Sequence, residues 1–223
     1  MVPFFKRYFQ VFLLLLACFF RQQVQAQNFA QWENEITGLE KKAAANPVKK
    51  RSIVFAGSSS IRLWEGLPTY FPGKKIVNHG FGGSQTAEVV HFADRLIIPF
   101  KPKQVVIYVG DNDLVAGKLP EKVFADFQQL FTKIRQSRPK ATVTFISIKP
   151  SPSRKQYYAA IQQTNNLIKD FLENQKKAAF VDIYTPMLGP NGKPKPELFR
   201  PDSLHMTKAG YDIWVEVLKP YLK

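Results

Sequence analysis

The sequence predicts an α/β protein of three layers, α/β/α, in which helices cover both faces of a five-stranded parallel sheet. Short runs rich in Val and Ile alternate with longer stretches in which apolar residues recur at helical spacing. Polar and glycine-rich segments follow several of the short runs, at the edge where parallel sheets hold their ligands. The alternation gives the fold class, and the segments after the strands give the place of the site.

Five short segments are expected to be strands. They are SIVFAG (52–57), KIVNHG (75–80), KQVVIYVG (103–110), TVTFISI (142–148) and AAFVDI (178–183). Nearly continuous apolar runs are typical of strands covered on both faces, so the sheet is expected to be parallel.

Five longer segments carry apolar stripes at helical spacing. The stripes lie at 32–39, 86–97, 123–134, 161–172 and 213–221, and Tyr221 is expected on the core face of the last one. Pro99 follows the second stripe and Pro120 precedes the third, which suits a helix end and a helix start. We interpret all five stripes, with Trp64 and Trp214, as parts of the hydrophobic core.

The first 26 residues predict a cleaved signal peptide. Lys6 and Arg7 precede an apolar run at 9–20, and the segment closes on a small-x-Ala pattern ending at Ala26. The run of about a dozen residues is short of the roughly 20 that span a bilayer, so no stable membrane anchor is expected. Cleavage after Ala26 would export one domain, residues 27–223, to the periplasm or the outside of the cell.

Cys18 is the only cysteine of the chain. A lipoprotein would use Cys18 as its lipidated residue, but its flanking residues suit that poorly and the Ala26 pattern lies downstream. After cleavage at Ala26 the mature chain would contain no cysteine, and therefore no disulfide, thiol nucleophile or cysteine-bound metal. The formal net charge of +15 is spread over the chain without a nucleic-acid-binding motif, so no nucleic-acid partner is expected.

Candidate functional residues follow the strands. The first strand is followed by Ser58, Ser59 and Ser60, the second by the segment 78–83 and the third by 110–113, while a proline-rich loop after the fifth closes on 202–205. Carboxyl ends of parallel strands meet at one edge of a sheet, so we expect these segments to lie together.

The residue types in these segments suit acyl transfer. A serine needs a base, and the base needs an acceptor that orients it, which His205 and Asp202 could provide. A glycine N–H at Gly83 and the Asn112 amide are suitable donors to an oxyanion. Two alternatives stay open here: Asp202 could cap the last helix near Thr207, and any of the three serines could be the nucleophile.

Other site chemistries fit less well. The segment NHGFGG lacks the G-x-G-x-x-G spacing and no P-loop lysine follows it. Asp111 and Asp113 could suggest calcium, but the EF-hand spacing and its terminal Glu are absent. No metal or cofactor is expected.

Taken together, the four segments resemble the SGNH hydrolases, also called the GDSL lipase/acylhydrolase family, over nearly the whole mature chain. The family pattern places a serine in G-D-S, a glycine, an asparagine in G-x-N-D and a D-x-x-H motif on Ser59, Gly83, Asn112, Asp202 and His205. The resemblance implies a flavodoxin-like fold, a Ser59–His205–Asp202 triad, and an oxyanion hole from the Ser59 N–H, the Gly83 N–H and the Asn112 side chain.

One residue departs from the family pattern. Ser58 stands where the family usually has Asp, so a charge is missing beside the nucleophile. A hydroxyl can still hydrogen-bond locally at such a turn, but it does not supply the charge. His79 is expected to serve the structure of its turn and His91 to face solvent.

The expected function is that of an exported serine esterase that works through an acyl-enzyme. The loops contain few large apolar residues, and Tyr157 and Tyr158 could stack on a sugar, which favours acetyl groups on carbohydrate. Alternatives are a lipase, lysophospholipase or thioesterase of the same fold, or a non-catalytic relative that binds carbohydrate or lipid.

Overall fold

The computed structural model describes residues 29–47 and 51–223. The chain divides into two compact units, residues 1–31 and 32–223, and the fold below is that of the second unit. The expected signal peptide lies outside the described residues and stays a prediction. Within 29–47 and 51–223, no helix combines the length and apolar character needed to cross a bilayer.

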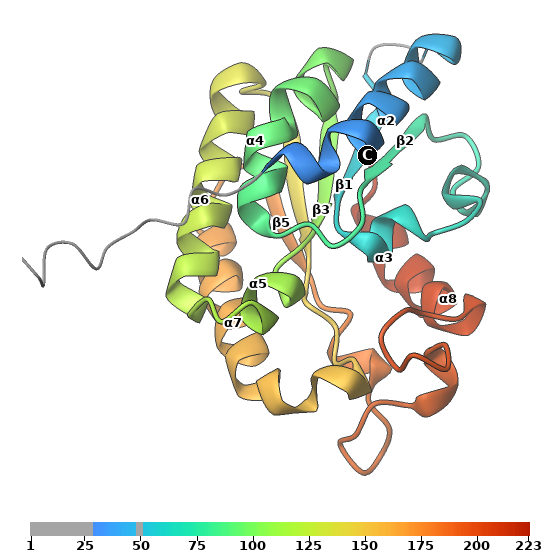
Figure 1. The fold of residues 1–223 in the computed structure, drawn as a ribbon, viewed down its shortest axis with the longest axis vertical. Helices are drawn as coiled ribbons and strands as arrows, with labels where there is room; N and C mark the ends of the chain where they lie inside the picture. Colours follow the sequence, from blue (N-terminus) through green and yellow to red (C-terminus); the bar gives the residue numbers. More distant parts are fainter. Residues whose placement is uncertain (1–28, 48–50) are drawn as a thin grey trace, which may run out of the picture. The chain divides into compact units, whose positions relative to one another are not determined.

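A five-stranded parallel sheet forms the centre of this unit (Figure 1). Its strands are β1 (Ile53–Gly57), β2 (Ile76–Gly80), β3 (Gln104–Tyr108), β4 (Thr142–Ile146) and β5 (Ala178–Val181), in the spatial order β2-β1-β3-β4-β5. This is the flavodoxin-like strand order. Each strand lies within its predicted segment, so the predicted fold class is confirmed.

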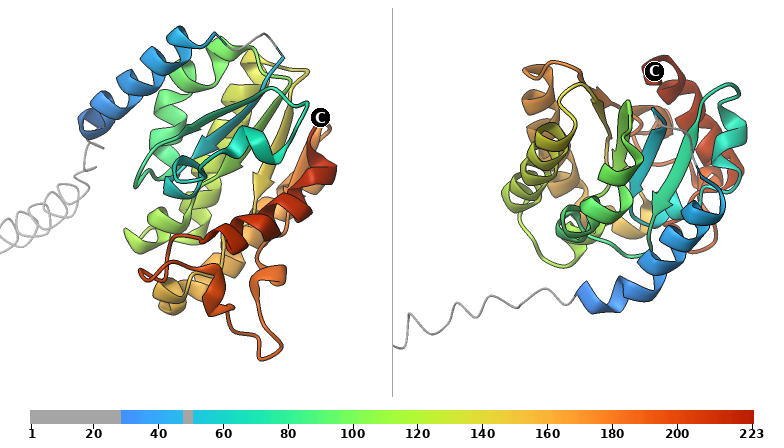
Figure 2. Two further views of the ribbon diagram at one scale, coloured as in Figure 1. Left: turned by 90° about the vertical axis from the view of Figure 1, so that its right-hand side faces the viewer. Right: turned by 90° about the horizontal axis from the view of Figure 1, so that it is seen from above.

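Helices cover both faces of the sheet (Figures 1 and 2). One face carries α4 (Thr86–Leu96), α6 (Pro120–Ser137) and α7 (Tyr158–Glu173), with α2 (Glu33–Ala45) packed on α4. The other face carries α8 (Lys208–Leu218) and the short helix α3 (Ser59–Arg62). A second short helix, α5 (Asp111–Val115), follows β3. The 3₁₀ turns of this unit are η2 (Leu67–Tyr70), η3 (Ile98–Phe100), η4 (Pro152–Tyr157), η5 (Thr185–Met187), η6 (Pro196–Leu198) and η7 (Lys219–Tyr221), and a further turn, η1 (Phe29–Trp32), starts in the first unit.

Alternate strand residues form the core beneath α8, because successive side chains of a strand point to opposite faces. Phe55 of β1 and Tyr108 of β3 belong to this cluster, together with Trp64 and Trp214. The two tryptophan rings lie 5.7 Å apart and both are buried, as predicted.

The prediction for Tyr221 is wrong. Helix α8 ends at Leu218, and Tyr221 falls in the 3₁₀ turn η7 with 39% of its surface exposed. Pro220 lacks the N–H that an α-helix would need there, so the helical period stops before Tyr221.

The strand register brings the candidate segments to one edge. Gly57 at the end of β1 pairs with Gly80 of β2 on one side and with Tyr108 of β3 on the other. The chain segments that leave these three strands therefore start side by side. The long loop after β5 is folded back by two antiparallel bridges, Leu188 with Pro194 and Phe199 with Met206.

Candidate active site

The serine turn begins at a glycine that no other residue could replace. Gly57 has a φ of +138°, and a Cβ added there would lie 1.8 Å from the backbone oxygen of Tyr108. The Ser58 N–H donates to that same oxygen at 3.0 Å, and α3 starts one residue later at Ser59. This sharp change from strand to helix presents Ser59, half-buried, at the carboxyl edge of the sheet.

Ser59, His205 and Asp202 form one chain of hydrogen bonds. The Nε2 atom of His205 lies 2.9 Å from Ser59 Oγ, and its Nδ1 atom lies 2.6 Å from Asp202 Oδ2. Ser59 and His205 are 146 residues apart in sequence, so only the fold brings them together. The geometry fits a serine activated by an oriented histidine.

Asp202 is held by its own turn. Its Oδ1 atom accepts the backbone N–H groups of Leu204 and His205, both at 2.9 Å. Desolvation raises the pKa of the Asp202 carboxyl, but these hydrogen bonds and the bond from the His205 ring outweigh it and bring the pKa to about 2. The alternative role as cap of α8 belongs to Thr207, whose Oγ1 accepts the Gly210 N–H at 3.4 Å.

The loop that carries Gly83 is held by hydrogen bonds of the two preceding residues, Phe81 and Gly82. The Phe81 N–H donates to the Gly57 oxygen at 2.9 Å, and the Gly82 N–H donates to the Glu35 carboxylate at 3.1 Å. The Trp32 indole N–H in turn donates to the Gly82 oxygen at 2.8 Å. Gly83 itself has a φ of +68° and open space where a Cβ would be.

Asn112 is fixed through both its backbone and its side chain. Its Nδ2 atom donates to the Ser84 oxygen at 3.0 Å, and its backbone N–H donates to Asp111 Oδ1 at 3.1 Å. One amide hydrogen of Asn112 stays available. In the described part of the chain, the N–H groups of Ser59 and Gly83 also have no hydrogen-bond acceptor. Three donors of the type that stabilise an oxyanion are therefore free.

The carboxylates considered for calcium have other partners. Asp113 is fully buried, accepts the Thr86 N–H at 2.9 Å and pairs with Lys118 at 2.9 Å. Burial raises the pKa of Asp113, and Lys118 opposes that shift. Asp111 pairs with Lys149 at 3.3 Å. Among the residues that the structure describes, no group of three or more metal-ligating side chains occurs.

Lys149 is the buried residue that the sequence interpretation missed. Its Nζ atom lies 3.0 Å from Ser60 Oγ and 3.0 Å from the Tyr108 hydroxyl, and only 1% of the residue is exposed. The available signal was its position, because Lys149 directly follows the apolar run 142–148 at the carboxyl edge of the sheet. Trp32 and Glu35, which hold the Gly82 turn, were likewise not singled out as supports of the site.

Among the described residues, Ser58 does not make the local hydrogen bond that its turn allows. Its hydroxyl is buried, with 0% of the residue exposed, and Ser58 Oγ has no hydrogen-bond partner among the described residues. The Ser58 backbone groups bond to Tyr108, Ile61 and Arg62, so the turn is held by the backbone and not by the Ser58 hydroxyl. Within the described part of the chain, the Ser58 side chain therefore supplies neither a charge nor a hydrogen bond where the family usually has Asp.

The remaining candidates have structural or surface positions. His79 is buried with Nδ1 2.6 Å from the Leu96 oxygen, and burial lowers its pKa. His79 thus bonds to the end of α4 and not within its own turn. His91 is exposed, as predicted. The Tyr158 hydroxyl donates to the Ser151 oxygen at 3.1 Å, and Tyr157 is half-buried.

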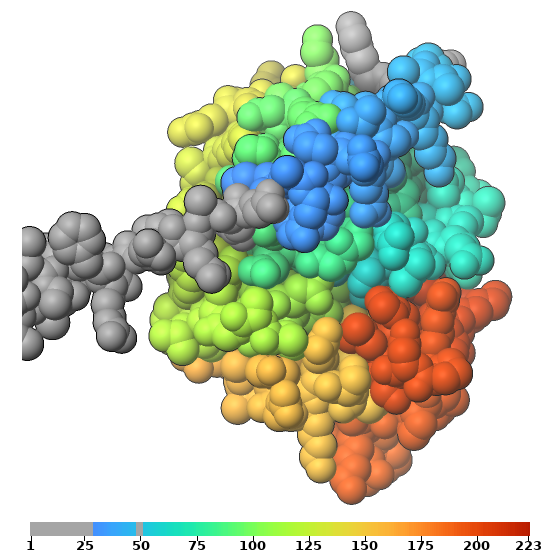
Figure 3. Space-filling model, viewed as in Figure 1, coloured from blue at the N-terminus to red at the C-terminus, as the bar shows by residue number. Residues whose placement is uncertain are grey.

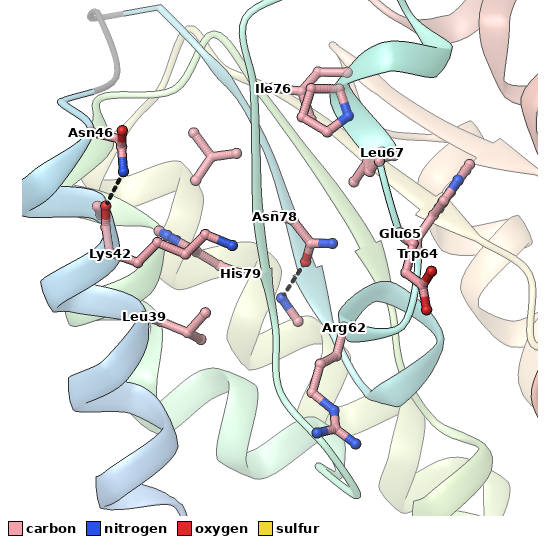
Figure 4. A pocket seen from close by; sticks show the side chains of 15 residues that line it. Leu39, Lys42, Asn46, Arg62, Trp64, Glu65, Leu67, Ile76, Asn78 and His79 are labelled. Carbon is pink, nitrogen blue, oxygen red and sulfur yellow. Dashed lines mark hydrogen bonds between the residues drawn. The ribbon is translucent and has the colours of Figure 1, made fainter.

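A separate hollow of about 550 Å³ lies beside the edge strand β2 (Figure 4). Leu39 and Lys42 of α2 line one side and Arg62 and Leu67 line the other, with His79 in the wall. This hollow and three further cavities on the described residues are not lined by Ser59, Gly83, Asn112, Asp202 or His205.

The segments that carry the site also meet on the surface. Figure 3 shows α3 in teal, α5 in light green, the segment after β4 in gold and the loop before α8 in red on one face of the molecule. Segments distant in sequence thus supply one site.

Solved structures of similar fold align with this chain over almost their own full length. A Streptococcus pneumoniae protein is 22% identical with a TM-score of 0.76, covering 90% of this chain and 97% of its own. A GDSL-like lipase from Bacteroides thetaiotaomicron is 23% identical with a TM-score of 0.69, covering 87% and 96%. A variant of a Geobacillus acetyl-xylooligosaccharide esterase is 16% identical with a TM-score of 0.64, covering 77% and 94%.

The sequence itself matches a family profile. No curated protein matches the chain. The profile of the GDSL-like lipase/acylhydrolase family, however, matches residues 52–213, which include every segment of the site. The chain therefore belongs to the GDSL-like lipase/acylhydrolase family.

Proposed function

We propose that the protein is a serine esterase whose nucleophile is Ser59. His205 Nε2 takes the Ser59 proton while Oγ attacks the ester carbonyl, and the Gly83 and Asn112 donors stabilise the oxyanion together with the Ser59 N–H. The intermediate collapses as the alcohol leaves with the proton from His205. Water, deprotonated by the same imidazole, then releases the acid and restores Ser59. Asp202 orients the ring and stabilises its charged form throughout.

The hydrogen-bond chain from Ser59 through His205 to Asp202 is the observation that carries this proposal. Both bonds are within 3 Å, and the second uses a carboxylate whose pKa is low enough to stay ionised at neutral pH. An ionised Asp202 favours the tautomer of His205 that has its proton on Nδ1, which leaves Nε2 free to act as a base.

The proposed substrate is a short acyl group, most simply acetyl, on a carbohydrate. The larger apolar side chains of the loop after β5, Met187, Leu198 and Phe199, are buried in the core and leave little apolar surface for a long acyl chain. Two proteins of similar fold carry carbohydrate esterase names, the Geobacillus enzyme and a family 3 carbohydrate esterase from Clostridium thermocellum.

Ester turnover and active-site labelling test the reaction. The protein should hydrolyse p-nitrophenyl acetate and react with a fluorophosphonate, and Ser59→Ala should lose both, with turnover falling at least about 1,000-fold. Ser137→Ala, at an exposed serine at the end of α6, is the matched control and should keep wild-type rates. A wild-type protein that shows neither reaction would be a non-catalytic relative.

Acyl-chain length tests the substrate class. Rates should be highest on p-nitrophenyl acetate or butyrate and fall toward palmitate, with acetate released from acetylated xylan or peptidoglycan. A maximum at eight carbons or longer, without acetate release from any glycan, would instead make the protein a lipase or lysophospholipase.

The proposed place of action is outside the cytoplasm, on the basis of the leader at residues 1–26. Expression of the full chain in a bacterial host should yield periplasmic or secreted protein whose intact mass equals that of a chain starting at Gln27. Retention of Met1 or lipidation at Cys18 would contradict cleavage after Ala26.

A further inference from the structure

A buried lysine lies directly behind the candidate active site. The three hydrogens of the Lys149 ammonium match three acceptors: Ser60 Oγ at 3.0 Å, the Tyr108 hydroxyl at 3.0 Å and Asp111 Oδ2 at 3.3 Å. The Tyr108 hydroxyl donates to the same Asp111 oxygen at 3.2 Å. The four polar side chains form a closed network in which the lysine charge is matched by one carboxylate.

The network touches two of the three segments that carry the oxyanion donors, the Ser59 turn and the helix with Asn112. Ser60 follows Ser59 in the chain, and its backbone oxygen accepts the Tyr211 hydroxyl at 2.9 Å. Asp111 precedes Asn112 and uses its second oxygen to accept the Asn112 N–H at 3.1 Å. Lys149 thus joins the turn of the nucleophile to the helix that holds the asparagine.

Several charged groups surround Lys149. Burial lowers its pKa, and the Asp111 carboxylate opposes this shift. The charge of Arg154 from η4 also lowers the pKa of Lys149, while the charge of Asp202 from the loop before α8 raises it. Tyr108 faces the ammonium from β3, and burial holds the pKa of this phenol well above its usual range.

A buried lysine–aspartate pair is a weak source of stability, because desolvation offsets most of the attraction between the charges. An apolar pair of similar volume would fill the same space at equal or lower free energy. The pair instead fixes the position of two segments with directional bonds, and a misplacement of about 1 Å at such a site can slow a reaction on the order of 100-fold.

We propose that Lys149 is a positioning residue that holds the Ser59 turn and Asn112 in the geometry that receives the oxyanion. This inference rests on the proposed esterase function. Lys149 does not contact the substrate; it acts through Ser60 and Asp111.

Lys149→Met tests this by removing the ammonium at nearly constant volume. On p-nitrophenyl acetate, kcat should fall on the order of 100-fold, while KM changes less than about threefold because ground-state contacts remain. Inactivation by a fluorophosphonate, which forms a tetrahedral adduct at Ser59, should slow in parallel. Lys208→Met is the matched control, since Lys208 pairs with Asp212 at 2.8 Å on the surface of α8, and it should keep wild-type kinetics.

Two further variants separate positioning from folding. Lys149→Met/Asp111→Asn removes both charges, so no unpaired carboxylate stays buried, and it should fold yet keep the low kcat. Lys149→Cys supplies the single cysteine of a chain prepared without its leader. Aminoethylation of that cysteine in the unfolded chain, followed by refolding, should restore kcat at least tenfold, whereas carbamidomethylation should not.

The outcomes are distinct. A folded Lys149→Met with kcat within threefold of wild type overturns the inference while Ser59-dependent turnover by the wild type still supports the esterase. A loss of kcat that only follows the folded fraction, without recovery on aminoethylation, also overturns it. Absence of Ser59-dependent turnover in the wild type would refute the proposed function and this inference with it.

Discussion

At the scale of single residues, Ser58 and Ser60 flank Ser59 and differ in whether their buried hydroxyls are hydrogen-bonded. Both are buried, yet Ser58 Oγ has no partner among the described residues, whereas Ser60 Oγ accepts from Lys149. A buried hydroxyl without a hydrogen bond lowers stability, and a satisfied one does not. The same substitution should therefore have opposite effects at the two positions.

Ser58→Ala should raise the free energy of unfolding by about 1 kcal/mol, because it removes an unsatisfied buried hydroxyl. Ser60→Ala should lower it by roughly 1–3 kcal/mol, because the Lys149 ammonium loses an acceptor. Urea denaturation of both variants measures the two signs. A loss of stability in Ser58→Ala equal to that in Ser60→Ala would show that Ser58 Oγ has a partner in solution.

Asp202 links stability to pH. Its pKa falls from the ordinary value of 3.8 to about 2 on folding. A lowered carboxyl pKa stabilises the folded state above the unfolded value, and this contribution disappears as the pH falls through the folded value. The advantage of the wild type over Asp202→Asn in unfolding free energy should thus be full near pH 5 and shrink between pH 4 and 2.

Denaturation at pH 5, 4 and 3 measures this difference. It should be small, since 46% of the Asp202 side chain is exposed and water screens its interactions. An advantage that grows as the pH falls would contradict the assigned hydrogen bonds. In the proposed reaction, Asp202→Asn should also slow turnover about 100-fold or more, because His205 loses the partner that orients it.

At the scale of elements, Asp113 joins α5 to the start of α4. It accepts the Thr86 N–H and the Thr86 hydroxyl at the first residue of α4, and it pairs with Lys118 just after α5. The loop between β2 and α4, with Gly83, therefore ends at a point fixed by the helix that carries Asn112. One carboxylate positions both elements relative to each other.

Asp113→Ala should lower the free energy of unfolding by about 3 kcal/mol, the cost of breaking a buried ion pair from one side. Asp113→Asn is the matched control. It keeps an acceptor for Thr86 and should cost less, and Lys118 retains Asp126 at 3.2 Å in both variants. Equal losses measured by urea denaturation would mean that the charge alone, and not the link to α4, accounts for the effect.

At the scale of the whole unit 32–223, α8 is held to the sheet by aromatic packing. Trp214 is fully buried, lies 4.9 Å from the Tyr108 ring and 5.7 Å from the Trp64 ring, and donates its indole N–H toward Met187 Sδ at 3.4 Å. The Asp202–His205 turn directly precedes α8, so this packing also supports the position of His205.

Trp214→Ala should lower the free energy of unfolding by about 3–5 kcal/mol through lost burial and the cavity that remains. Tyr221→Ala, at the exposed tyrosine in η7, should change it by less than about 0.5 kcal/mol. Thermal and urea unfolding of the pair measure the contrast. Similar losses in the two variants would indicate that the C-terminal turn, and not the α8 interface, limits stability.

The sequence by itself determined the elements and the order of the candidate segments. The apolar runs ending at Gly57 and Gly80 and the stripes after Pro120 depend on near neighbours in the chain, so their periodicity identifies strands and helices directly. The motif positions of Ser59 and His205 followed from a family resemblance, because residues alone did not choose among three serines.

Only the tertiary structure decided which side chains meet behind those motifs. Lys149 bonds to Ser60, and Glu35 accepts the Gly82 N–H, through contacts that depend on strand order and helix packing. The same packing buries Ser58 Oγ without a partner among the described residues. A lysine that follows an apolar run has the same local sequence pattern whether its side chain is exposed to solvent or buried against the serine turn. The free energy that decides between these positions comes from burial and from hydrogen-bond partners distant in the chain, which local sequence does not contain.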